Sequence, residues 1–159
     1  MVNKRLIIAV DDSKECLKAL DFAHEHFPTG YTYYLVHMQP RPLSYPYIAS
    51  AVATESAYEH LHAMEKEMAA ASHLFMEEVF APKARSTGAE VCVAVVMVDS
   101  DSSRHIGAAI CKLAEKAKAD ALIMMRQNKS AVAHFFLGSV TQYCAAHSPT
   151  PVIIVPNSV

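Results

Sequence analysis

The chain has 159 residues, of which 52% are hydrophobic and 19% are charged, and its formal net charge is -2. This composition excludes a disordered chain and predicts one globular domain over residues 1–159. A charge so close to neutral does not favour binding to nucleic acid or to an anionic membrane, and no apolar run reaches the roughly eighteen residues that a transmembrane helix needs.

The first part of the chain is predicted to form a strand, a helix and a second strand. Residues 5–10 (RLIIAV) are a short β-branched apolar run, typical of a strand buried on both faces. Asp12 and Ser13 can cap the helix that follows, and Pro28 ends it. Residues 31–38 (YTYYLVHM), rich in tyrosine, predict the second strand.

The middle of the chain adds a loop, a long helix and a third strand. Residues 39–50 contain three prolines and are predicted to be a loop. Ser56 and Glu59 form a capping box for a long helix. Residues 90–98 (EVCVAVVMV) predict the third strand. The stripe of the long helix that we expect to be buried is Leu61, Met64, Met68, Ala71, Phe75 and Val79.

The last part of the chain continues the alternation. The segment 99–103 (DSDSS) is predicted to be a turn that caps the next helix. Residues 120–125 predict a fourth strand, 138–147 a last helix and 151–155 a last strand. The apolar positions of the helix after the turn are Ile106, Ile110, Leu113 and Ala117.

This βαβαβαβαβ order predicts a parallel sheet covered by helices on both faces. Right-handed crossovers then give a doubly wound, three-layer α/β sandwich of the Rossmann-like kind. Ligands of such sheets bind at the carboxyl ends of the strands. The segments that could carry a site are therefore 10–13, 38–40, 98–103 and 124–141. The strand at 151–155 has no strand after it, and we expect this apolar edge to be covered by a partner.

Three segments carry a more specific pattern. They are IIAVDDSKECLKALDFA (7–23), YLVHMQP (34–40) and FFLGSVTQYCAAHSPTPVIIVP (135–156), of which the last is the most distinctive. Together they resemble the universal stress protein family from the first strand to the last. The resemblance implies an adenine nucleotide alpha hydrolase-like sheet of order 3-2-1-4-5, frequent homodimers, and a role in stress response or signalling.

The ATP-binding members of that family carry a spaced glycine motif: glycine, two residues, glycine, nine residues, then glycine with serine or threonine. Here Met125 and Asn128 replace the first two glycines, and only Gly138 and Ser139 remain. Glycine lets such a loop adopt positive φ and lets N–H groups approach phosphate. Asparagine is the best substitute for that conformation. The side chain of Met125, by contrast, is able to fill space that a ribose or phosphate would use.

The resemblance also implies which residues would hold an adenine nucleotide. Asp11 and Met38 stand at the family's adenine-side positions, and Arg126 and Lys129 could add positive charge near a triphosphate. The expected cofactor is ATP, which would bring Mg²⁺ with it, and no separate metal site is predicted. The full set of expected binding residues is Ala9, Asp11, Met38, Met124, Met125, Gln127, Asn128, Gly138, Ser139, Val140 and Thr141.

Two functions stay open at this point. One is a signalling domain that binds an adenine nucleotide, and the other is a nucleotide-free, dimeric interaction protein of the same family, paired through its last strand. No catalytic residue is predicted, because no general base or Mg²⁺-binding acid stands out beyond Asp11. Four widely spaced cysteines indicate reduced thiols, and the N-terminal apolar run is too short for a signal peptide. We therefore expect a cytoplasmic protein.

Overall fold

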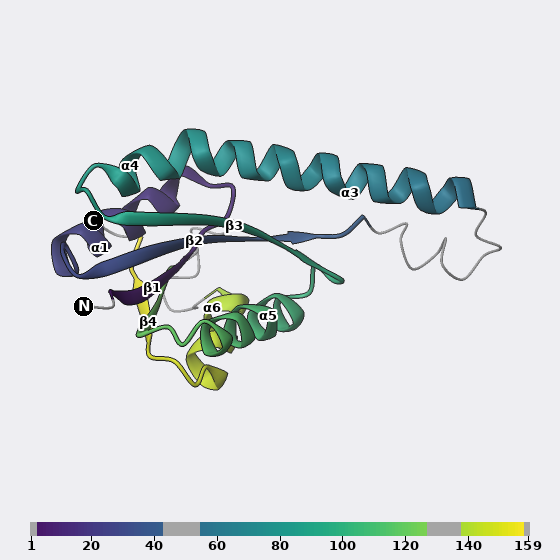
Figure 1. Cartoon of the computed structure of the whole chain (residues 1–159). Helices are drawn as coiled ribbons and strands as arrows, with labels where there is room; N and C mark the ends of the chain where they lie inside the picture. The colour runs from purple at the N-terminus through teal and green to yellow at the C-terminus, as the bar shows by residue number, and fades with distance from the viewer. Residues whose placement is uncertain (1–2, 43–54, 127–137, 158–159) are drawn as a thin grey trace.

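A computed structural model describes residues 3–42, 55–126 and 138–157 of the chain. Within these residues, parallel strands form a sheet in the order β3-β2-β1-β4-β5, which confirms the predicted topology (Figure 1). The strands are β1 (Lys4–Ala9), β2 (Tyr31–Pro40), β3 (Glu90–Val98), β4 (Ala121–Met125) and β5 (Val152–Val155).

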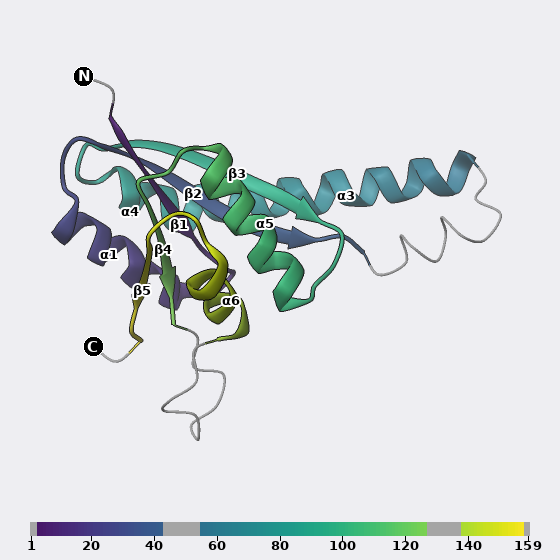
Figure 2. The same ribbon diagram turned by 90° about the horizontal axis from the view of Figure 1, so that it is seen from below.

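Helices cover both faces of this sheet. Figures 1 and 2 show α1, α3 and α4 on one face and α5 and α6 on the other. The long helix α3 projects past the end of the sheet in both views. The helical elements are a 3₁₀ turn η1 (Lys14–Cys16), α1 (Leu17–His26), α3 (Glu55–Phe75), a π-helical segment η2 (Met76–Phe80), α4 (Ala81–Arg85), α5 (Ser103–Lys116) and α6 (Ser139–His147).

The sheet divides the core into two layers, because successive side chains of a strand point to opposite faces. Each buried aliphatic side chain contributes about 1.5–3 kcal/mol to stability, so both layers stabilise the sheet. The layer beside α1 and α4 includes Leu6, Ile8, Val10, Cys16, Leu20, Leu35, Phe80, Ile123, Met125 and Val155. The layer beside α5 and α6 includes Ile7, Val36, Met38, Val98, Ile110, Cys111, Ala114, Leu122, Met124 and Cys144.

The second strand is longer than predicted. Pairing between β2 and β3 continues to Pro40, which lies opposite Val98, so the loop predicted to begin at residue 39 was wrong at its start. Proline cannot donate to the ladder, but at the last position of a strand the loss of one N–H interrupts little of the pairing. Here the backbone N–H of Arg41 donates to the carbonyl of Val98 at 2.8 Å. The Arg41 side chain then pairs with Glu65 of α3 at 2.6 Å.

The long helix differs from its prediction at its start and in its buried stripe. The predicted capping box was wrong, because α3 already includes Glu55, whereas a capping residue must lie outside the helix. Ala71, expected in the buried stripe, is exposed. The large apolar side chains after it that are fully buried are Met76 and Phe80, which belong to η2. A π-helical turn holds more residues than an α-turn, and this shifts the buried face.

Candidate functional site

Segments far apart in the chain meet at the carboxyl edge of the sheet. Ala9, near the end of β1, lies beside Met124 of β4 in the strand register. Thr141, in the first turn of α6, is buried, and its hydroxyl donates a long hydrogen bond of 3.5 Å to the carbonyl of Met125. Four of the residues predicted for the site are thereby brought together where β1, β4 and α6 meet.

Asp11 follows β1 and is held by the turn that leads into α1. Its Oδ1 accepts a hydrogen bond from the backbone N–H of Ser13 at 2.8 Å and another from the thiol of Cys16 at 3.1 Å. Ser13 makes no side-chain cap to the helical turn, so the capping predicted for Asp12 and Ser13 is replaced by a bond to Asp11. The carboxylate is therefore oriented by its own loop.

Met124 and Met125 point to opposite faces of the sheet. Met124 is in the core layer of α5 and α6, together with Met38. Met125 is only 5% exposed and belongs to the other layer, with Val10 and Val155. Met125 therefore has a structural role in the packing between the sheet and α1. Whether its side chain also limits the space for a ribose or phosphate stays a prediction.

The start of α6 combines buried and exposed groups. Gly138 precedes the helix with φ -54° and ψ 144°, which is an extended conformation open to any residue. Glycine at this position is thus not required for a left-handed backbone. Val140 packs against the core, whereas Ser139 is exposed. The first N–H groups of a helix have no acceptor inside the helix, and the positive end of its dipole lies there.

The start of α5 lies against the start of α6, which sequence reasoning missed. The hydroxyls of Ser103 and Ser139 form a hydrogen bond of 2.5 Å. The turn before α5 behaves as predicted, because the Ser102 hydroxyl accepts a hydrogen bond from the N–H of His105 at 3.3 Å. The serines of the DSDSS segment were the available signal, but they were interpreted only as a helix cap.

A glycine allows these two helices to approach closely. A Cβ atom on Gly107 of α5 would lie 2.6 Å from Cδ1 and 3.0 Å from Cβ of Tyr143 on α6. Such distances are too short for a larger residue unless the Tyr143 side chain or one of the helices moves. Gly107 therefore determines how near the starts of α5 and α6 come to each other.

The remaining predicted residues of the site give less information. Gln127, Asn128 and Lys129 lie outside the described residues. Arg126 is described, and its backbone N–H donates to Val155 at 2.8 Å. Between β2 and the end of β1, Nδ1 of His37 lies 3.0 Å from the carbonyl oxygen of Val10. A carbonyl only accepts, so Nδ1 carries the proton in this contact.

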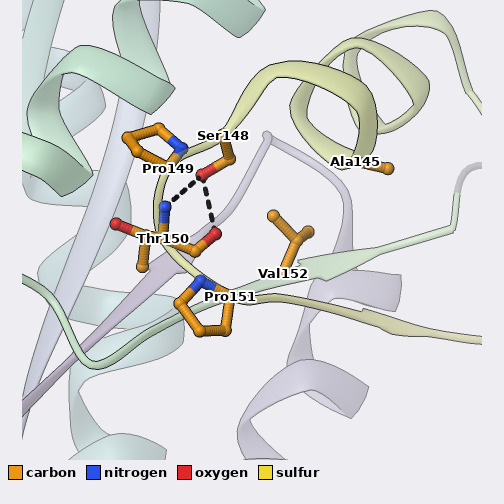
Figure 3. A pocket seen from close by; sticks show the side chains of 6 residues that line it. All are labelled: Ala145, Ser148, Pro149, Thr150, Pro151 and Val152. Atoms are coloured by element: carbon orange, nitrogen blue, oxygen red, sulfur yellow. Dashed lines mark hydrogen bonds between the residues drawn. The ribbon is translucent and has the colours of Figure 1, made fainter.

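An open pocket of about 400 Å³ lies elsewhere, at the turn between α6 and β5 (Figure 3). The hydroxyl of Ser148 accepts from the N–H of Thr150 at 3.1 Å and donates to its carbonyl at 2.8 Å. This turn precedes β5, so the pocket is at the amino edge of the parallel sheet. It is therefore at the opposite edge from Asp11 and the start of α6.

The described residues contain neither a membrane-spanning helix nor a cluster of metal ligands. In the ranges 3–42, 55–126 and 138–157, no helix is both long and apolar enough to cross a membrane. Across those same ranges, no three histidine, cysteine, aspartate or glutamate side chains cluster closely enough to hold a metal ion.

The sheet order and the helices on both faces define a doubly wound α/β protein, a class of fold whose ligands bind at the carboxyl ends of the strands. Comparison with family models is more specific, because the model of the Universal stress protein family matches residues 3–156. The chain belongs to that family. Comparison with curated proteins gives no match.

Solved structures share the fold over almost the whole chain. The hypothetical protein MJ0577 has a TM-score of 0.73 and 20% identity, with 98% of this chain and 97% of that one covered. A universal stress protein in complex with cAMP has a TM-score of 0.62 and 21% identity, with coverages of 99% and 100%. An Arabidopsis thaliana family protein with AMP bound has a TM-score of 0.59 and 16% identity, with coverages of 96% and 90%. At these identities the likeness shows the fold.

Proposed function

We propose that this chain is a stress-response or signalling module that binds an adenine nucleotide at the carboxyl edge of its sheet. The observation that carries the proposal is the junction of two helix starts, where Ser139 of α6 contacts Ser103 of α5. Thr141, in the same turn of α6, contacts the end of β4. Family membership and the relatives with cAMP and AMP support the same ligand class.

Each part of the nucleotide has a proposed place. The phosphate would lie against the N–H groups of Ser139–Thr141, where the helix dipole favours an anion. The base would lie near Asp11, Ala9 and Met38, with Met124 beneath it. Asp11 is acceptor-only when ionised, so it would pair with a donor on the nucleotide.

The proposal has a finer form, in which the nucleotide is ATP with Mg²⁺. Arg126 and the segment that follows it would then add contacts to the longer phosphate chain. We assign no catalytic step to the site. The same proposal takes residues 1–159 as a single domain, as the length and composition suggest, and places it in the cytoplasm, as the widely spaced cysteines suggest.

Calorimetric titration tests nucleotide binding directly. AMP, cAMP and ATP·Mg²⁺ should each be titrated, with adenosine as a ligand that lacks phosphate. In Ser139→Asp, the new carboxylate would repel phosphate while remaining compatible with the start of a helix. We expect this variant to bind AMP about tenfold more weakly and adenosine unchanged.

The matched control is Gln142→Glu, an equal charge change one turn further along α6, where Gln142 is exposed. We expect this variant to bind AMP nearly as well as the wild type. The proposal is overturned if millimolar AMP, cAMP and ATP·Mg²⁺ all give no binding heat and purified protein releases no nucleotide on denaturation.

A second candidate function is a nucleotide-free interaction protein that acts as a homodimer. The observation that favours it is the edge position of β5, whose residues Val152, Ile153 and Ile154 are only half-buried. An apolar edge strand has backbone groups that a second copy can pair. Dimer formation through β5 is itself compatible with nucleotide binding, because β5 and the start of α6 lie at different places in the fold. The two candidates differ in whether an adenine nucleotide binds at all.

A further inference from the structure

A small hydrogen-bonded cluster lies where β1 passes into α1. Oδ1 of Asp11 accepts from the N–H of Ser13 at 2.8 Å and from Sγ of Cys16 at 3.1 Å. The hydroxyl of Ser13 lies 3.8 Å from the same sulfur and donates to it. The Ser13 N–H and the Cys16 thiol therefore both donate to a single carboxylate oxygen of Asp11.

The 3₁₀ turn η1 places Cys16 for this contact. The backbone N–H of Cys16 donates to the carbonyl of Ser13 at 3.2 Å, which folds the turn back toward Asp11. Cys16 is 3% exposed and belongs to the core layer that contains Val10 and Met125. Its sulfur is thus fixed by packing on one side and by the carboxylate on the other.

The thiol is a permanent donor in this position. Burial raises the pKa of Cys16 to about 12, so the proton stays on sulfur at neutral pH. An ionised carboxylate can only accept, so the direction of the bond is determined. Such a carboxylate accommodates about four donors, and these two bonds from the turn orient Asp11.

We propose that Cys16 is a positioning residue for the nucleotide site, whose thiol holds the Asp11 carboxylate in the orientation that accepts a hydrogen bond from the exocyclic amine of adenine. The inference rests on the proposed function and deepens it, because it assigns base recognition to this pair. A base with a carbonyl in place of that amine, as in inosine 5′-monophosphate (IMP), cannot donate to Asp11 there. Cys16 should therefore affect the preference for AMP over IMP.

A purely structural role for Cys16 makes a different prediction. A buried cysteine often acts as a small apolar side chain, and its loss then weakens all ligands equally through stability. Cys16→Ala removes the donor, whereas Cys16→Ser keeps a donor of similar size. Cys111→Ala is the matched control, because Cys111 is a buried thiol in the opposite core layer.

The experiment is calorimetric titration of AMP and of IMP into the wild type and these three variants, with thermal unfolding to confirm that each is folded. We expect Cys16→Ala to weaken AMP binding by about tenfold and IMP binding by less than about twofold. Cys16→Ser and Cys111→Ala should keep the wild-type AMP/IMP ratio. The inference is overturned if Cys16→Ala keeps that ratio, or if Cys16→Ser loses it as fully as Cys16→Ala does.

A second readout does not depend on any nucleotide. The infrared S–H stretching band of Cys16, identified as the band missing from Cys16→Ser, should move to higher wavenumber in Asp11→Ala because the thiol loses its acceptor. An unmoved band would contradict the hydrogen bond itself. If the wild type binds neither AMP nor IMP, the proposed function fails and the inference fails with it. If the wild type binds AMP but Cys16→Ala keeps the AMP/IMP ratio, only the inference fails.

Discussion

Met125 connects the candidate site to the hydrophobic core at the level of a single residue. Its side chain packs with Val10 and Val155 on the α1 side, while its carbonyl accepts the hydroxyl proton of Thr141 on α6. The main effect of a smaller residue here would be a cavity in the core. Any change at the carboxyl edge of the sheet would be secondary. Replacing Met125 by glycine to open the site would therefore be confounded by lost stability.

We expect Met125→Ala to lower the free energy of unfolding by about 2–5 kcal/mol, since it removes a buried side chain and leaves a cavity. Urea denaturation followed by circular dichroism measures this change. Met68→Ala is the control, because Met68 is only half-buried on α3, and it should cost much less. A loss below about 1 kcal/mol for Met125→Ala would mean that its side chain is not part of the packed core.

Cys16 also makes stability depend on alkaline pH. The pKa of its thiol is raised from the ordinary 9.0 to about 12, first because of burial. Above about pH 9 the unfolded chain loses this proton and the folded chain keeps it. The contribution of the protonated Cys16 thiol to the free energy of unfolding is therefore complete below pH 9. It declines as pH rises toward 12, by at most about 1.4 kcal/mol per pH unit.

Urea denaturation at several pH values between about 8 and 10, with a reductant present, checks this slope. Cys144, whose pKa burial raises in the same direction, adds to the decline. In Cys16→Ser, the free energy of unfolding should fall less steeply with pH, because serine does not ionise in this range. A curve of equal slope in the wild type and in this variant would contradict the assignment to Cys16.

At the level of elements, the pair α5 and α6 depends on the missing side chain of Gly107. Alanine at an exposed helix position is about 1 kcal/mol better than glycine. At Gly107, however, its methyl group would meet the ring of Tyr143 at 2.6 Å. Overpacking of this kind costs about 1–3 kcal/mol and exceeds the gain in helix propensity.

We therefore expect Gly107→Ala to destabilise the protein. In a double-mutant cycle, the variant that combines Gly107→Ala with Tyr143→Ala should lose less stability than the sum of the two single changes. Thermal and urea denaturation of the two single variants and the double variant measure the coupling. Ala108→Gly, at the exposed neighbouring position, is the control for propensity alone. Additive effects of the two changes would show that the helices do not touch at this point.

At the level of the whole molecule, the two edges of the sheet differ in length and flanking residues. The edge strand β3 has nine residues, and β5 has four, between Pro151 and Pro156. Proline lacks an N–H and limits how far pairing can extend along an edge. The strand pairing in a dimer through β5 would thus be short. Side chains beside the strand would also have to contact the partner.

We expect the wild type to sediment at twice the 17.4 kDa of one chain. Ile154→Lys in β5 should give the monomer, because a partner strand would have to desolvate the added charge. Val95→Lys in β3 is the control at the other edge and should remain dimeric. A wild type that is monomeric at every concentration, or a dimer lost only in Val95→Lys, would contradict pairing through β5.

The sequence by itself determined the fold class, the strand order expected from the family resemblance, and the position of the last helix. These follow from local patterns, since short β-branched runs such as residues 5–10, alternating with helical patterns, are typical of strands buried between helices. The start of α6 at Gly138 and Ser139 was also predictable, because the motif spacing and the helix pattern coincide there. Errors occurred at Pro40, where the strand ends, and in the π-helical segment between α3 and α4, where distant packing outweighs local preference.

Only the tertiary structure decided which atoms meet. The contact of Ser103 with Ser139 joins residues far apart in the chain. Alternation along β4 puts Met124 and Met125 on opposite faces, but the helices that cover each face decide which one joins the α1 layer. The bond from Cys16 to Asp11 needs a 3₁₀ turn packed against that layer. Such contacts depend on how layers pack in three dimensions, which residue spacing along the chain does not specify.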